Sequence, residues 1–220
     1  MRILVCVLLS SICINSEQVF VACEGNYYDG NQGTLWTISE GTISEYPDNP
    51  IGNIAQSLYV YDDLLFLAVN GSGNIQVFQI TDSSLIPLHI IDTQSSGPRE
   101  MLVYNDNLYF TNWYSVDVKK LSLSTWEIES EIAMPGLPED IILHDGYIYV
   151  SITMNLDWSD ASSVVVIDPD GEAIINTYDV GYGPGSLLAH NGAVYVSRTY
   201  YDSSWNAFYG TSRIRSNGVI

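Results

Sequence analysis

Short apolar runs separated by tight polar turns recur along the chain. Leu102–Asn112 consists of an apolar segment, the polar turn Asn105-Asp106-Asn107 and a second apolar segment, and the same pattern returns at Leu58–Val69, Ile142–Ser151 and Leu188–Ser197. Runs of four to eight apolar or alternating residues bounded by Asn, Asp and Gly indicate β-strands joined by hairpin turns. No long segment with a helical period and capping signals occurs in the sequence, so an all-β fold is predicted.

These hairpins repeat at a nearly constant spacing. The aromatic residue in the second strand of each copy marks the period, because successive markers lie 40 to 46 residues apart: Phe20, Phe66, Tyr109, Tyr149 and Tyr195. A period of this length that contains only strand signals is typical of β-propeller blades, each a four-stranded antiparallel sheet. The sequence therefore predicts a β-propeller.

One repeat can be divided into four strands, which we letter A to D in chain order. The predicted strands are Glu100–Tyr104, Leu108–Asn112, Val116–Leu121 and Trp126–Ala133. In the last of them, apolar residues alternate with Glu127, Glu129 and Glu131, which is the pattern of an outer strand with one face in water. In such a blade the A–B and C–D turns lie on one face, and the B–C and D–A connections lie on the other.

The first and last repeats are incomplete in the sequence pattern. The first begins at strand B (Val19–Cys23), and the last predicted strand, at residues 212–220, corresponds to strand C of a fifth unit. About four and a half blades are therefore expected, as a fragment of a ring of six to eight blades. Such a ring, with about 43 residues in each blade, would need roughly 260–340 residues.

The N-terminus has the pattern of an export signal. Met1-Arg2 supplies a positive charge, Ile3–Leu9 is apolar, and small or polar residues follow up to Ser16. We assign residues 1–16 to a signal peptide and residues 17–220 to the propeller domain. Cleavage before Cys13, which would then carry a lipid, is an alternative, although Ile12 stands where a small residue is expected. Either alternative predicts an extracytoplasmic protein, which is periplasmic, exposed on the outer surface or secreted.

The charge composition excludes some partners. The chain holds 7 Lys and Arg against 26 Asp and Glu, for a formal net charge of −19, and no Lys or Arg occurs between Arg2 and Arg99. Nucleic acids and anionic membrane surfaces require clustered basic residues, so neither is an expected partner. Contact with a membrane is expected only through a lipid on Cys13. Such acidity keeps a protein soluble and favours cations.

Several segments resemble a known repeat family. Asn70–Phe78 (NGSGNIQVF) is similar to the YVTN repeat of extracytoplasmic β-propellers, as are the Gly-Pro pairs at Gly97-Pro98 and Gly183-Pro184, which precede strand A. The opening segments Val21–Asn26 and Asn31–Leu35 also resemble the start of related surface propeller lipoproteins. Some members of that group bind cobalamin beside an outer-membrane transporter. The resemblance implies the fold, and it raises a small molecule or a surface transporter as a partner.

The longer loops fall on the face that holds the B–C and D–A connections. They are the segments 24–33, 112–116, 153–163 and 198–211, and their composition is rich in Tyr and Trp with Asp among them. Aromatic side chains give a large contact area at little rotamer cost and stack on flat ligands or sugar rings. We predict a ligand-binding rim formed by Tyr27, Tyr28, Asp29, Trp113, Tyr114, Asp157, Trp158, Asp160, Tyr200, Tyr201, Asp202 and Trp205.

Catalytic motifs are scarce in the sequence. Three scattered His residues give no zinc spacing, and neither a G-x-S-x-G elbow nor a P-loop is present. No catalytic residue and no resident cofactor is predicted, and calcium at Asp157 and Asp160 is kept as an option because hard cations take several oxygen ligands. The preferred function is a non-enzymatic binding module. The alternatives are a metal-dependent hydrolase or lactonase, with Asn53, Glu100 and Glu139 as candidate ligands, and a structural surface-layer or adhesion module.

Overall fold

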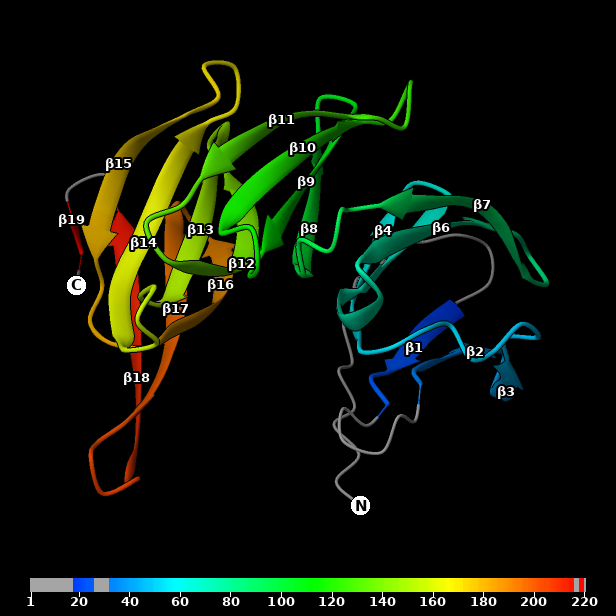
Figure 1. The fold of residues 1–220 in the computed structure, drawn as a ribbon, viewed down its shortest axis with the longest axis horizontal. Coiled ribbons are helices and arrows are strands. Elements are labelled where there is room, and N and C mark those ends of the chain that lie inside the picture. Colours follow the sequence, from blue (N-terminus) through cyan, green and yellow to red (C-terminus); the bar gives the residue numbers. More distant parts are fainter. Residues whose placement is uncertain (1–17, 26–31, 216–217, 220) are drawn as a thin grey trace. The chain divides into compact units, whose positions relative to one another are not determined.

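A computed structural model describes residues 18–25, 32–215 and 218–219 (Figure 1). These residues form five antiparallel sheets and a single one-turn 3₁₀ helix, η1 (Asn70–Ser72). The predicted signal segment and Cys13 lie outside the described residues. None of the described residues belongs to a helix long and apolar enough to span a membrane.

The chain divides into two compact units, residues 1–100 and 101–220. Unit 1 holds two sheets. The first has three strands, in the order β1 (Gln18–Cys23), β2 (Thr34–Ser39) and β3 (Thr42–Glu45). The second has four strands, in the order β4 (Ala55–Tyr61), β5 (Leu64–Val69), β6 (Asn74–Ile80) and β7 (Leu85–Asp92).

Unit 2 holds three four-stranded sheets, and its first strand carries the chain over from unit 1. The first sheet consists of β8 (Pro98–Tyr104), β9 (Asn107–Asn112), β10 (Asp117–Ser122) and β11 (Ile128–Ala133). The second consists of β12 (Leu137–His144), β13 (Tyr147–Met154), β14 (Asp160–Asp168) and β15 (Ala173–Asp179). The third consists of β16 (Pro184–His190), β17 (Ala193–Tyr201), β18 (Ala207–Arg215) and β19 (Gly218–Val219).

Every sheet is a meander in which strands adjacent in sequence pair antiparallel, which is the blade of a β-propeller and confirms the predicted fold class. The first repeat differs from the other four because its described residues form three strands. Turn chemistry explains the tight hairpins. Asp145-Gly146 and Asn191-Gly192 both have positive φ, as two-residue hairpin turns of this type require.

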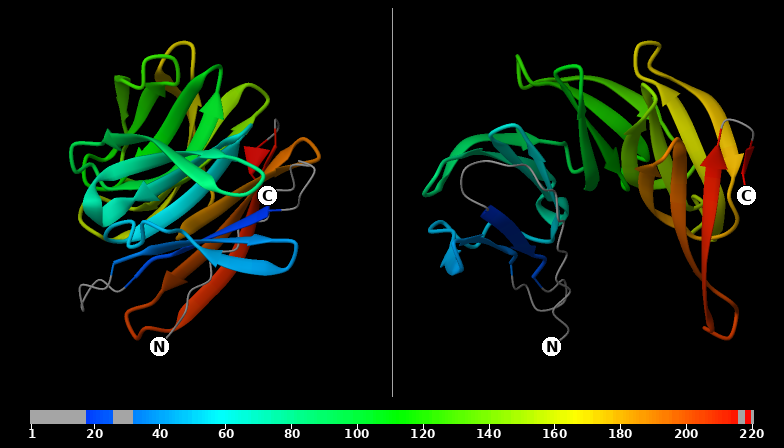
Figure 2. Two further views of the ribbon diagram at one scale, coloured as in Figure 1. Left: turned by 90° about the vertical axis from the view of Figure 1, so that its right-hand side faces the viewer. Right: turned by 180° about the vertical axis from the view of Figure 1, so that it is seen from behind.

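The structure corrects the prediction for the last repeat. The segment 198–211, expected to be a long loop, is mostly strand, because β17 and β18 pair from Val194↔Ile214 out to Tyr201↔Ala207 and leave a connection of only residues 202–206. The third strand of this sheet is therefore β18, and β19 follows as a short fourth strand. Tyr, Phe and Thr fill the segment, and these residues favour strands, so a loop was the wrong interpretation. Figures 1 and 2 show this hairpin extending beyond the other strands of unit 2.

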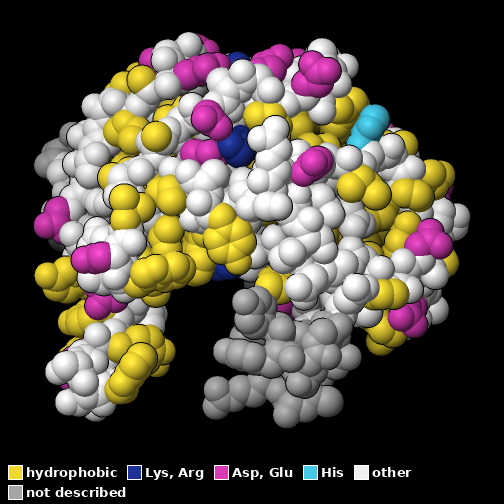
Figure 3. Space-filling model, in the orientation of Figure 1, with side chains coloured by type: hydrophobic (Ala, Val, Ile, Leu, Met, Phe, Trp, Pro, Cys, Tyr) yellow, Lys and Arg dark blue, Asp and Glu magenta, His cyan; other side chains and the backbone are white. Residues whose placement is uncertain are grey.

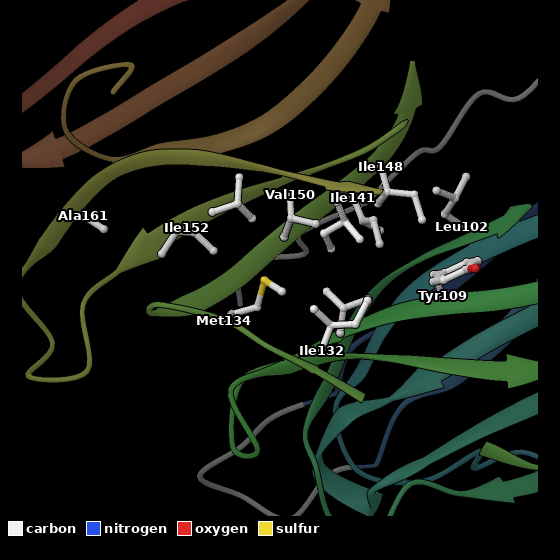
Figure 4. Packing of buried hydrophobic residues seen from close by; sticks show 12 residues of the cluster. Leu102, Tyr109, Ile132, Met134, Ile141, Ile148, Val150, Ile152 and Ala161 are labelled. Atoms are coloured by element: carbon white, nitrogen blue, oxygen red, sulfur yellow. The ribbon is translucent and has the colours of Figure 1, made fainter. Parts of the chain in front are cut away.

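The sheets of unit 2 pack through continuous apolar clusters. Figure 4 shows the larger of these clusters, in which Ile132 and Met134 face Ile148 and Val150 of β13. The second cluster joins Val164 and Val180 to Val194 and Val196 of β17. Residues two apart on a strand point to the same side, so the even-numbered residues of β17 face the sheet β12–β15.

Polar contacts also join neighbouring sheets within unit 2. Lys120 Nζ lies 2.9 Å from Glu172 Oε1, and the Thr111 hydroxyl donates to the carbonyl of Glu139 at 2.7 Å. The backbone N–H of Leu187, on β16, donates to Asp140 Oδ2 on β12 at 2.6 Å. Burial raises the pKa of Asp140 to about 6, against the lowering effect of two backbone hydrogen bonds. This carboxylate therefore holds two sheets together at the expense of partial desolvation.

Candidate functional site: the B–C turns and the adjoining groove

The B–C turns are the connections that follow β5, β9, β13 and β17, and all four place the same position in a left-handed conformation. The fourth residue after the strand has positive φ in each: Gly73 (63°), Val116 (55°), Trp158 (67°) and Trp205 (63°). In three of them its backbone N–H donates to the carbonyl of the first residue of the turn, which is Asn70, Asn155 or Asp202. The four turns are therefore one structural element with a variable fourth side chain.

Glycine is the residue that this position favours, and two of the four turns carry tryptophan instead. A left-handed conformation costs an L-residue about 1–2 kcal/mol, and a bulky side chain makes such a residue a conformational outlier. Neither ring is buried in exchange, because 64% of Trp158 and 82% of Trp205 is exposed. Strain that is not offset by burial is found mostly at functional sites.

Two of the predicted ligand carboxylates build these turns. Asp157 Oδ1 accepts hydrogen bonds from the backbone N–H of Ser159 at 3.0 Å and from its hydroxyl at 2.5 Å. Asp202 accepts from the backbone N–H groups of Ser204 and Asn206 and from the Asn206 amide. These hydrogen bonds lower the pKa of both carboxyl groups. Asp157 and Asp202 thus hold the turn in the shape that presents each tryptophan.

The aromatic side chains of unit 2 form four ring contacts at this face. Trp113 meets Trp158 edge to face, with ring centroids 6.3 Å apart, and Trp205 lies 6.2 Å from Tyr201 in a tilted arrangement. Tyr200 stacks on Phe208 at 5.0 Å and contacts Tyr182 edge to face at 5.9 Å. Figure 3 shows the hydrophobic side chains that cover the β17–β18 hairpin, at the lower left.

A polar groove of about 510 Å³ adjoins these rings. It is lined by Asn155, Ser159, Asp160, Ala161, Ser162, Ser163 and Tyr182. Tyr182 comes from the D–A connection between β15 and β16, and the other residues come from the B–C turn and the start of β14, so both kinds of connection share one face, as predicted. The β15–β16 connection is held by two backbone hydrogen bonds, in which the N–H of Gly183 donates to the carbonyl of Ala161 and the N–H of Thr199 donates to the carbonyl of Gly183.

The predicted site residues divide into three groups. Trp113, Trp158 and Tyr114 lie at the B–C turns after β9 and β13, and Asp160 lines the groove. Tyr200, Tyr201 and Trp205 lie on the β17–β18 hairpin, while Asp157 and Asp202 form turns as described above. Tyr27, Tyr28 and Asp29 lie outside the described residues.

Sequence reasoning did not select Tyr182, Phe208, Asn155, Ser162 or Ser163. The signal for Tyr182 was present, since it stands between Gly181 and Gly183, both with positive φ, in a D–A connection. The serines were not distinguishable from ordinary strand residues, because their position depends on the sheet register. Within the described part of the chain, no group of three or more His, Cys, Asp or Glu residues is placed to hold a metal ion.

Comparison with known proteins supports the fold alone. No family model and no curated protein matches the sequence. Among solved structures, hydrazine synthase of Kuenenia stuttgartiensis is 10% identical with a TM-score of 0.72, and the match covers 92% of this chain and 61% of that chain. The WD40 domain of Neurospora crassa Pan2 is 10% identical with a TM-score of 0.68, covering 93% and 61%. A candidate 6-phosphogluconolactonase from Bacteroides uniformis is 11% identical with a TM-score of 0.65, covering 92% and 73%.

The chain thus spans about three fifths of the length of the first two of these structures. Identity at this level establishes a shared β-propeller architecture and carries no information about a shared ligand or reaction.

Proposed function

We propose that the protein is a binding module, without catalytic activity of its own, that holds a polyhydroxylated small molecule such as a saccharide at the B–C turns of unit 2. The observation that carries this proposal is the pair of exposed tryptophans at positions where the backbone favours glycine. Exposed Trp and Tyr rings can stack on the apolar faces of sugar rings, as the ligand-contacting aromatics of binding proteins do.

The groove beside the rings supports the same class of ligand. Its polar lining consists of four hydroxyl groups (three Ser and Tyr182), one amide and one carboxylate, which together donate and accept hydrogen bonds without introducing a basic residue. Polar groups of this kind would fix the orientation of a ligand that the aromatic rings hold by contact area. A partner protein with a glycosylated or otherwise polar surface would use the same residues.

The test is binding of the full chain to an oligosaccharide array. The double variant Trp158→Gly, Trp205→Gly keeps the turn backbone and removes both rings, so binding should be lost. Trp126→Gly is the matched control, because Trp126 also has positive φ (60°) but lies in the C–D turn between β10 and β11. Equal binding by the double variant and the wild type would contradict the proposal.

We also propose that the protein is exported, on the basis of the N-terminal sequence pattern. N-terminal analysis of the mature protein distinguishes the two processing routes. Cleavage after Ser16 gives a free protein, whereas a mature chain that begins with a lipidated Cys13 is anchored to a membrane. An intact Met1 in the cellular protein would contradict both.

A further inference from the structure

Arg198 lies beneath the aromatic cluster of the β17–β18 hairpin. It pairs with Gly210 across the hairpin, two residues before Tyr200 on the same strand. Because residues two apart share a face, Arg198 and Tyr200 continue the row that begins with Val194 and Val196. That row faces the sheet β12–β15, whose strand β14 supplies Ser162 and Ser163 to the groove.

Two glycines make room for the guanidinium group. A Cβ atom on Gly210 would lie 2.6 Å from Arg198 Nη2, and a Cβ on Gly181 would overlap Nη1. Gly181 directly precedes Tyr182, which both lines the groove and contacts Tyr200. The guanidinium group therefore lies in a slot between the β15–β16 connection and β18. Tyr182, at the edge of this slot, belongs both to the groove lining and to the aromatic cluster.

Arg198 has no carboxylate partner among the residues that the structure describes. Its Nε is buried and without a hydrogen-bond partner in that part of the chain. Lys119 and Lys120 of the same unit differ, because each lies within 4 Å of two carboxylates. The planar guanidinium group of an arginine can donate two parallel hydrogen bonds to a carboxylate or a similar oxyanion. Because no carboxylate of the described chain takes this place, the group is suited to an anion of a bound ligand.

We propose that Arg198 binds a carboxylate group of the ligand, so that the ligand class is an acidic saccharide that carries uronic acid residues. This inference rests on the proposed function and adds the charged group of the ligand. The aromatic rings would hold the sugar faces, the groove would bind the hydroxyl groups, and Arg198 would select the acid over the neutral sugar.

The acidity of the whole chain does not prevent such a contact. At physiological ionic strength, exposed charges are screened beyond about 8 Å, whereas a bidentate contact in a partly dry slot acts at hydrogen-bond distance. The net charge would slow the approach of an acidic ligand and lower its affinity relative to the neutral form, and the direct contact with Arg198 has to exceed this screened repulsion.

The experiment measures selectivity on matched pairs with the full chain. An array presents oligomers of galacturonic, glucuronic and mannuronic acid, each beside the neutral form made by reducing its carboxyl groups. We expect at least one acidic oligomer to bind about tenfold or more tightly than its neutral form, which is the contribution of one charge-assisted hydrogen-bond pair.

Two variants and one control locate the effect. Arg198→Gln removes the charge, and Gly210→Ala displaces the guanidinium while keeping it, so both should bring the acid-to-neutral ratio close to one. Arg215→Gln, on an exposed residue of β18 outside the slot, should keep the ratio of the wild type. Circular dichroism confirms that each variant folds.

The outcomes separate this inference from the proposed function. Equal binding of acidic and neutral oligomers by the wild type, or an unchanged ratio in both slot variants, overturns the role of Arg198 and leaves the saccharide proposal standing. Binding of none of the oligomers overturns both.

Discussion

The B–C turns of the two units share a backbone and differ in what that backbone supports. In unit 1 the left-handed residue is Gly73, whose carbonyl accepts from the backbone N–H and the hydroxyl of Thr93 at 3.0 and 2.8 Å. A Cβ on Gly73 would lie 2.9 Å from the Cα of Ser95. The turn of unit 1 is thus covered by the chain that follows β7.

In unit 2 the same position holds Val116, Trp158 or Trp205. The valine packs against the core of the unit, whereas both tryptophans are exposed. Among the described residues, the fourth position of this turn is covered at Gly73 and Val116 and exposed at Trp158 and Trp205.

The largest expected effect is on binding. Replacing Trp158 and Trp205 together by glycine should lower the affinity for the saccharide ligand by on the order of a thousandfold, because an aromatic anchor that the bound ligand covers contributes roughly 2 kcal/mol or more. Isothermal titration with the best ligand from the array checks this. A loss of less than about tenfold would show that the two units do not differ in function at this turn.

The next effect concerns the dependence of stability on pH, in which unit 2 is distinguished by Asp140. Its folded pKa of about 6 lies above the ordinary value of 3.8. The group therefore contributes stability that is fully present below about pH 4 and is lost as the pH rises through 6. The loss amounts to about 3 kcal/mol, at 1.36 kcal/mol for each pKa unit.

Urea unfolding at about pH 4, 5, 6 and 7 tests this for the wild type and Asp140→Asn. The wild type should lose about 3 kcal/mol more than the variant across the series, since the amide does not ionise. Hydrogen exchange should place the difference in β12 and β16, which this carboxylate joins. Parallel curves for the two proteins would show that the carboxylate is solvated at neutral pH.

A smaller effect tests the structural role of the turn in unit 1. Gly73→Ala should lower the free energy of unfolding by about 2 kcal/mol, because the new methyl group both strains the backbone and meets Ser95. Gly192→Ala is the control, since Gly192 has a similar φ of 67° with nothing within 4 Å of the added atom. It should cost about 1 kcal/mol. Equal losses in the two variants would remove the steric part of the argument.

The smallest expected change in the free energy of unfolding is that of Trp205→Gly, and it tests whether this tryptophan of unit 2 contributes to the fold. Removing a tryptophan from a protein usually costs 3–5 kcal/mol when the ring is in the core. For Trp205→Gly we expect a change within about 0.5 kcal/mol, because relief of the left-handed strain offsets the lost contact with Tyr201 and the added chain entropy. Thermal and urea unfolding check it. A loss of 2 kcal/mol or more would show that Trp205 is part of the fold.

Much of the fold could be predicted because a strand period of two and a repeat of 40 to 46 residues are properties of the sequence itself. The predicted strands Glu100–Tyr104 and Leu108–Asn112 match β8 and β9 within two residues at each boundary, and the copies of this hairpin identified the blades. The long strands β17 and β18 were missed, because a polar and aromatic segment without a turn signal can be either a loop or a strand. Only the pairing of the two strands decides between these alternatives.

The ligand-binding rim stays a prediction, and only the positions of its residues can be compared with the sequence. The Tyr and Trp content of the loops identified the face, and Trp158 and Trp205 were selected by type. Their left-handed conformation was not visible, although Asn70, Asn155 and Asp202 stand at the same position of three turns. The slot around Arg198 depends on Gly181 and Gly210, which are 29 residues apart and become neighbours only when β15–β16 lies against β18.

The B–C turns after β13 and β17 are each closed by two backbone hydrogen bonds, which leaves one side chain free to vary. In the turns after β13 and β17, the first residue donates its N–H to the carbonyl of the fifth, and the fourth donates to the first. The side chain of the fourth residue takes part in neither bond. The side chain at this position can therefore be exchanged by one codon in each of these two turns while their backbone hydrogen bonds stay unchanged, which makes the position suitable for randomisation in directed evolution.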